Sequence, residues 1–149
     1  MLQRNGLSEQ TLVVFTSDNG PWLSKGSHGG SAWPLRAGKS TPYEGGHRVP
    51  AIFRQPGPVA QDVTCNVIAT MMGLLPTCVR MAGGDLPAGL DGHDLMPLLR
   101  SEVSNVSPYE ALFIEGTVRQ QGWKLILHPD GNVELFNLDE DIAEKMNLS

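Results

Sequence analysis

Apolar residues are grouped along the chain in short blocks and in one longer helical period. Residues 11–15 and 49–53 are runs of β-branched and aromatic side chains, a pattern typical of fully buried strands. Between residues 66 and 81 apolar side chains recur at the spacing of one helix face, and Gly83 with Gly84 would stop that helix. We therefore expect two buried strands followed by a helix that faces a core.

The carboxyl-terminal third has a different pattern, with shorter apolar runs and closer turns. Strands are predicted at residues 111–115, 123–128 and 133–137, and Pro129 to Asn132 would join the last two as a hairpin. A short Leu-rich helix is expected at residues 95–99. The acidic run at 139–141 would cap a final helical turn near Glu144.

Composition indicates a globular chain with many loops. The 149 residues suffice for one domain, and 17 Gly with 11 Pro favour loops over disorder because hydrophobic content is 40%. A net charge of -5 argues against a general nucleic-acid-binding surface, which normally needs clustered basic residues. No run approaches the roughly 18 apolar residues of a membrane span, and the first residues lack a signal-peptide pattern.

The two cysteines, Cys65 and Cys78, have no zinc-site spacing and allow a single disulfide. Both lie on or beside the predicted helix, which favours buried free thiols. Sequons for N-glycosylation begin at Asn105 and Asn147, and they matter only in a secreted eukaryotic protein.

The first candidate site follows the strand at residues 11–15, where the chain reads Thr16-Ser17-Asp18-Asn19-Gly20. In open α/β sheets ligands bind at the carboxyl ends of strands. The Asp18 carboxylate and the Asn19 amide offer hard oxygen ligands that suit Ca²⁺ or Mg²⁺. The alternative is an Asx turn that ends in glycine.

A second candidate site lies in the glycine-rich loop around Lys39, which has Gly38 before it and Gly45-Gly46 after it. Glycines let the backbone approach a ligand, and a lysine supplies a compact positive charge for an oxyanion. The alternative is a surface ion pair between Lys39 and Glu44. In the loop at residues 21–34, His28 is either a solvated side chain or a donor to an anionic substrate group.

Together these segments resemble the carboxyl-terminal part of the sulfatase (arylsulfatase) family in the alkaline phosphatase-like superfamily. The resemblance is carried by TSDNGPW at residues 16–22, LRAGKSTPYEGG at 35–46 and HRVPAIFRQPG at 47–57. It implies an α/β fold: the end of a mixed sheet sandwiched by helices at residues 1–100, then a small antiparallel subdomain at 101–149. It also implies that Asp18 and Asn19 ligate a divalent cation, usually Ca²⁺, and that Lys39 contacts the sulfate ester.

The same resemblance implies groups that this chain does not supply. The family's nucleophile is a formylglycine made within a Cys/Ser-x-Pro/Ala-x-Arg motif, and neither Cys65 nor Cys78 lies in such a motif. We therefore expect the chain to be inactive alone and to need a missing amino-terminal sulfatase segment as its partner. The chain itself carries no address, and the resemblance suggests a secreted, periplasmic or lysosomal location. A noncatalytic module that binds anionic glycans and a phosphatase or phosphodiesterase of the same superfamily remain alternatives.

Overall fold

The computed structural model describes residues 1–102 and 106–149, and these form two compact units. The first unit contains Met1–Thr16 and Ala51–Tyr109, and the second contains Ser17–Pro50 and Glu110–Ser149. The segment 17–50 belongs to the same compact unit as the carboxyl-terminal residues 110–149. In the described ranges no helix is long and apolar enough to cross a membrane.

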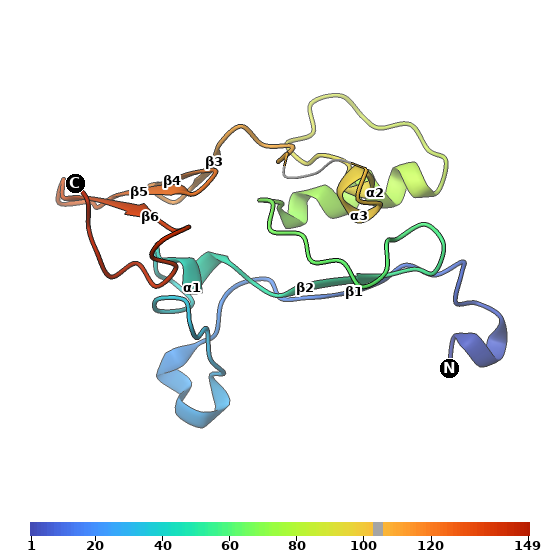
Figure 1. Ribbon diagram of the computed structural model, residues 1–149, viewed down its shortest axis with the longest axis horizontal. Coiled ribbons are helices and arrows are strands. Elements are labelled where there is room, and N and C mark those ends of the chain that lie inside the picture. The colour runs from blue at the N-terminus through green and yellow to red at the C-terminus, as the bar shows by residue number, and fades with distance from the viewer. Residues whose placement is uncertain (103–105) are drawn as a thin grey trace. The chain divides into compact units, whose positions relative to one another are not determined.

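The first unit holds a two-stranded antiparallel sheet, in which β1 (Val13–Thr16) pairs with β2 (Ala51–Arg54) so that Phe15 lies opposite Ile52 (Figure 1). Both strands were predicted, with bounds shifted by one or two residues. The prediction that they are fully buried was wrong: Phe15 is 62% exposed and Ile52 61% exposed. In the part of the chain that the structure describes, this sheet has only two strands, so one of its faces stays open to solvent.

The helix predicted at residues 66–81 begins later than expected. The 3₁₀ turn Met71–Gly73 leads into α2 (Leu74–Met81), and residues 66–70 are not helical. Pro76 lies in the first turn of α2, where its missing N–H costs nothing. Thr77 connects α2 to α3 (Met96–Leu99), since its hydroxyl donates to Gly73 O at 2.6 Å and accepts the Leu95 N–H at 2.8 Å.

The two cysteines of the first unit differ in part from the expectation. Cys65 and Cys78 are free thiols but exposed, so the prediction that they are buried was wrong. Cys65 lies outside α2, and Cys78 points away from the side on which Pro76 and Thr77 are buried. At the start of the same unit, Gly6 terminates the 3₁₀ turn Gln3–Asn5 with a φ of 68°.

The second unit is built on a four-stranded antiparallel sheet in the order β3-β4-β5-β6 (Figure 1). Its strands are β3 (Leu112–Ile114), β4 (Thr117–Gln120), β5 (Trp123–Leu127) and β6 (Val133–Asn137). The predicted hairpin between β5 and β6 is confirmed, with the His128 N–H bonded to Asn132 O at 2.9 Å. The β4 strand was not predicted, because three of its four residues, in the sequence TVRQ, are polar and show no alternation of apolar side chains.

The core of this unit lies on one face of the sheet, where Ile126, Phe136 and Leu138 are buried and Tyr43 packs against them. Tyr43 directly precedes the short helix α1 (Glu44–His47), and the 3₁₀ segment η2 (Leu23–His28) lies earlier in the same unit. The predicted final helical turn near Glu144 is absent and turns occupy its place. Of the two sequon asparagines, Asn147 is exposed and Asn105 lies outside the described residues.

Candidate functional site

Asp18 and Asn19 occupy a turn directly after β1. The Ser17 hydroxyl donates to Asn19 O at 2.9 Å, which fixes the turn through Ser17 and leaves the Asp18 side chain exposed. Asn19 is half-buried and Gly20 is buried. The segment is therefore a tight turn held by the Ser17 side chain, and the Asp18 carboxylate is exposed to solvent.

The turn at Gly20 packs directly against the glycine-rich loop. The Gly20 N–H donates to Gly46 O at 3.0 Å, and the Lys39 N–H donates to Pro21 O at 2.9 Å. A Cβ on Gly20 would lie 1.8 Å from Gly45 O, and one on Gly38 would lie 2.4 Å from Pro21 O. Only glycine allows this approach of two backbones, so the sequence places the Asp18 turn beside the loop that carries Lys39.

Replacing Gly20 with alanine should separate these two segments. The added methyl group has no space against the Gly45 carbonyl, so we expect a loss of about 1 to 3 kcal/mol in the free energy of unfolding. Urea denaturation of the 149-residue chain measures this loss. Ser24→Ala, in an exposed position of the same unit, serves as the control, and equal stability of both variants would contradict the close packing.

The Lys39 side chain does not pair with Glu44, so the surface ion pair considered from the sequence was wrong. Glu44 is buried and pairs instead with Lys124 at 3.1 Å and with Arg119 at 3.5 Å. The Lys39 ammonium lies 5.4 Å from the ring centroid of Trp22, where it makes a cation–π contact. Lys39 is exposed, and within the described ranges no carboxylate lies in ion-pair distance of it.

His28 is less well defined as a site residue. It ends η2 and is exposed, and in the described part of the chain no hydrogen bond joins its ring to Asp18 or Lys39. The structure places His28 in the same compact unit as the other candidates but not in contact with them.

A buried ion cluster anchors the far end of the Lys39 loop. Lys124 is 2% exposed, and its ammonium lies 3.1 Å from Glu44 Oε1 and 2.9 Å from Glu144 Oε1. The Glu44 N–H donates to Glu144 Oε2 at 2.8 Å, so one carboxylate holds the first turn of α1. Sequence reasoning missed this cluster, although the period of β5 places Lys124 on the same face as buried Ile126.

The electrostatics of the cluster follow from its burial. Burial raises the pKa of Glu144, and the Glu44 N–H and the Lys124 ammonium oppose that rise only in part. Burial lowers the pKa of His47 in α1, and the positive charge of Lys124 lowers it further. Both shifts disfavour the charged form of a buried group, and the Lys124 ammonium acts against this by favouring the ionised form of Glu144.

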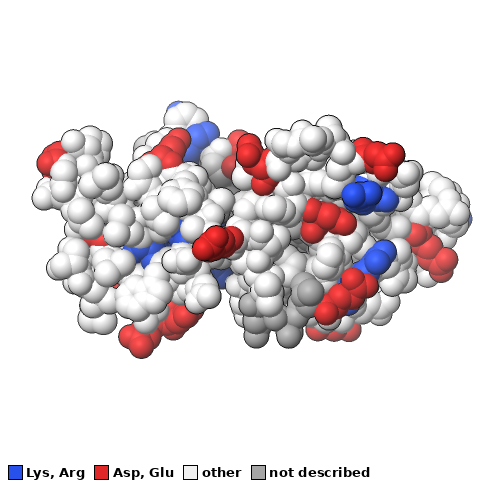
Figure 2. Space-filling model, turned by 90° about the horizontal axis from the view of Figure 1, so that it is seen from above, with Lys and Arg blue, Asp and Glu red and all other residues white. Residues whose placement is uncertain are grey.

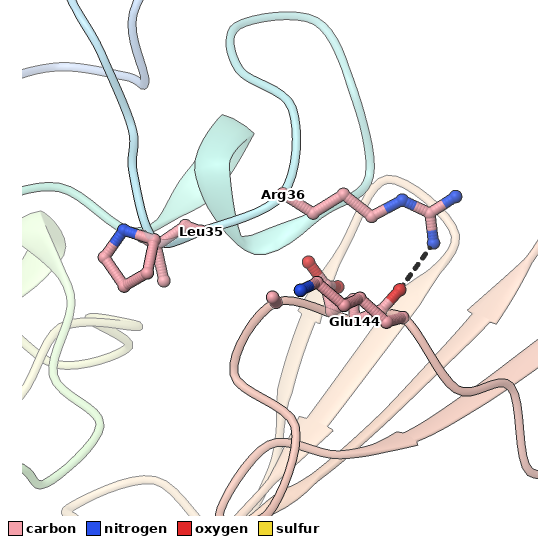
Figure 3. Close-up of a pocket in the computed structure, with 6 residues that line it drawn as sticks. Leu35, Arg36 and Glu144 are labelled. Atoms are coloured by element: carbon pink, nitrogen blue, oxygen red, sulfur yellow. Dashed lines mark hydrogen bonds between the residues drawn. The ribbon is translucent and has the colours of Figure 1, made fainter.

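The near end of the loop is held by Arg36. Its guanidinium donates to Glu144 O at 2.8 Å (Figure 3). The guanidinium also stacks on the Tyr43 ring, with its carbon 3.7 Å from the ring centroid. Glu134 accepts the Tyr43 hydroxyl at 2.9 Å and also contacts His128 at 3.0 Å. Burial acts to raise the pKa of Glu134, but the bonds from His128 and Tyr43 and the charge of Arg36 lower it overall. The Lys39 loop is therefore fixed on both sides.

An open pocket of about 450 Å³ lies beside this anchor. It is lined by Pro34, Leu35, Arg36, Ala143, Glu144 and Lys145 (Figure 3). Arg36 is bonded to the Glu144 backbone carbonyl at this pocket, and the lining is more apolar than polar.

The residues suited to hold a metal are Asp18 and Asn19, which offer one carboxylate and one amide oxygen. Ca²⁺ takes six to eight oxygen ligands. Within the described ranges no group of three or more His, Cys, Asp or Glu side chains could hold a metal ion. The donor chemistry fits a hard cation, and most of its coordination shell must come from elsewhere.

Comparison with known proteins identifies the class. The Sulfatase family model matches residues 1–84, and the chain belongs to the sulfatase family, whose members are hydrolases. Arylsulfatase A of Homo sapiens is 49% identical over 109 residues, which cover 72% of this chain and 21% of the relative. Arylsulfatase A of Bos taurus is 48% identical over 176 residues, covering 96% of this chain and 34% of the relative.

Solved structures agree with this assignment. The crystal structure of Ps i-CgsB in complex with k-i-k-neocarrahexaose matches 99% of this chain with a TM-score of 0.84 and 31% identity. The PsFucS1 sulfatase from Pseudoalteromonas sp. matches 99% with a TM-score of 0.85 and 26% identity. Each match covers 34% of the solved chain, so this chain spans between a fifth and about a third of the relatives named here.

Proposed function

We propose that this chain contributes to the hydrolysis of a sulfate ester, supplying part of a metal site and part of a sulfate site. The observation that carries the proposal is the crossing of two backbones at Gly20 and Gly46, which sets the Asp18 turn beside the Lys39 loop. A cation held by Asp18 and Asn19 and the Lys39 ammonium would then act on the same ester group.

Each residue has a distinct role in this mechanism. Asp18 and Asn19 would hold a divalent cation, Ca²⁺ by preference, which supplies Lewis-acid polarisation of the sulfate oxygens when bound. Lys39 neutralises negative charge on the leaving oxygen as the ester bond breaks. His28 is a candidate donor to a further oxygen of the substrate. Charge neutralisation and positioning dominate such transfers, as they do in phosphoryl transfer.

The substrate class follows from the exposed lysine and from the relatives. Two structural relatives are solved with a neocarrahexaose and with D-glucosamine-2-N,6-O-disulfate, and other relatives are named arylsulfatases. These names support a sulfated saccharide or an aryl sulfate as the substrate of this chain. In Figure 2 the basic side chains lie in small separate groups among acidic and uncharged ones.

The chain is expected to turn over no sulfate ester by itself, because charge neutralisation without an activated nucleophile leaves the displacement to water. The exposed thiols of Cys65 and Cys78 are not substitutes, since neither lies in a Cys/Ser-x-Pro/Ala-x-Arg motif. A formylglycine and the remaining metal ligands would come from an amino-terminal sulfatase segment.

Complementation tests this function. The purified chain is assayed with Ca²⁺ and an activated aryl sulfate, alone and then joined to an upstream segment expressed with the formylglycine-forming enzyme. We expect activity only in the complemented protein, and we expect Asp18→Ala to raise the Ca²⁺ concentration needed for half activity. Turnover by the lone chain, or a complemented protein that prefers aryl phosphate, would contradict the assignment.

A further inference from the structure

Trp22 brings two lysines together. The Lys25 ammonium lies 4.5 Å from the centroid of the Trp22 ring, and the Lys39 ammonium lies 5.4 Å from the same centroid. The two positive charges are therefore no farther apart than the sum of these distances. Trp22 itself is 53% exposed, so a ligand can reach both charges and the ring from solvent.

The backbone fixes the bases of both side chains. The Lys25 N–H donates to Trp22 O at 3.0 Å, and the Lys39 N–H donates to Pro21 O at 2.9 Å. A Cβ on Gly29 would lie 2.2 Å from Trp22 O, which shows how tightly η2 folds back on the start of its own loop. The two lysines thus extend from neighbouring, anchored backbone positions rather than from free loops.

The charge balance at Trp22 is the reverse of that in the rest of the chain. The net charge is -5, and in the second unit Glu44, Glu134 and Glu144 all pair with cations. Within the described ranges neither Lys25 nor Lys39 has a carboxylate in ion-pair distance. An exposed cation–π contact compensates the repulsion of two like charges only weakly, so the arrangement favours a ligand with two negative groups.

We infer that Trp22, Lys25 and Lys39 form a subsite for a doubly anionic ester, with the reacting sulfate at Lys39 and a second anionic group at Lys25. The ligand class is a multiply sulfated saccharide, because one sugar ring can carry two sulfates, one for each of the two ammonium groups beside the Trp22 ring. Lys25 then determines specificity, because it selects substrates by a group that does not react. This subsite rests on the sulfate ester function proposed above.

Binding of two matched probes to the 149-residue chain tests this subsite. The indole N–H signal of Trp22, assigned with Trp22→Phe, is followed by NMR during titration with glucosamine 6-sulfate and with glucosamine 2-N,6-O-disulfate. We expect the disulfate to bind about threefold to fivefold more tightly, the gain of one exposed ion pair. Lys25→Met should remove that preference and leave the monosulfate affinity unchanged, whereas Lys39→Met should weaken both probes.

The controls separate this subsite from the function on which it rests. Arg80→Met removes one positive charge from an exposed position of α2 in the first unit and should change neither affinity. The subsite would be overturned if Lys25→Met kept the preference for the disulfate or weakened both probes equally. It would also be overturned if the parent chain did not bind the disulfate. A preference that depends on Lys25, together with a complemented protein inactive toward sulfate esters, would retain the subsite and refute the hydrolase.

Discussion

Lys124→Met is expected to lower the free energy of unfolding of this chain by about 3 to 5 kcal/mol at neutral pH, the usual cost of breaking a buried ion pair. The substitution leaves the Glu44 and Glu144 carboxylates buried without the ammonium that now lies 3.1 and 2.9 Å from them. Urea denaturation followed by circular dichroism measures the loss. The Lys39 loop would lose its anchor at α1 in the same variant.

The loss should depend on pH with a defined sign. The pKa of Glu144 is already raised by burial, and removing Lys124 raises it further, so the variant favours a protonated carboxyl. A carboxyl group whose pKa is higher in the folded than in the unfolded state stabilises the fold at pH values below its unfolded-state pKa. That contribution is lost as pH rises through its folded-state pKa. The destabilisation should therefore shrink as pH falls from 7 towards about 4.5, near the ordinary pKa of a glutamate.

Two matched variants identify the cause. Lys124→Met combined with Glu144→Gln removes one buried negative charge and should recover part of the lost stability, because the remaining Glu44 still contacts Arg119 at 3.5 Å. Arg80→Met, at an exposed position of α2, should change stability by less than about 0.5 kcal/mol. If the free energy of unfolding of Lys124→Met equalled that of the parent at every pH, the buried ion cluster would make no net contribution to stability.

Lys39→Ala is expected to lower kcat of the complemented enzyme by about 10² to 10³, with a smaller change in KM. Lys39 has no carboxylate partner in the described residues, so its charge is free to act on the leaving oxygen, and removing it should act mainly in the transition state. Steady-state kinetics with an activated aryl sulfate measures the change.

Further variants separate a catalytic from a structural role of Lys39. Lys39 is exposed, so Lys39→Ala should leave the urea midpoint within the error of the parent protein. Lys39→Arg keeps the charge but changes its geometry and should restore part of kcat. If kcat of Lys39→Ala equals that of the parent, the residue belongs to the surface, and the sulfate site must be sought elsewhere in the second unit.

The sequence alone determined the local elements and the family. Apolar blocks of β-branched residues located β1, β2, β5 and β6, because strand propensity and turn residues act over a few neighbouring positions. The order of Asp18, Asn19 and Gly20 at the end of β1 and the glycines around Lys39 indicated both candidate loops and the sulfatase resemblance, which the family model confirms. These features depend on short stretches of chain.

Only the tertiary structure decided which charges meet and which surfaces are buried. Glu44 pairs with Lys124 and not with neighbouring Lys39, since burial on one face of the sheet brings together residues 80 positions apart. The exposure of Phe15 and Cys78 likewise depends on what packs against each face, which a local pattern of apolar residues does not specify. Periodicity shows which side chains share a face, and tertiary packing decides whether that face is covered.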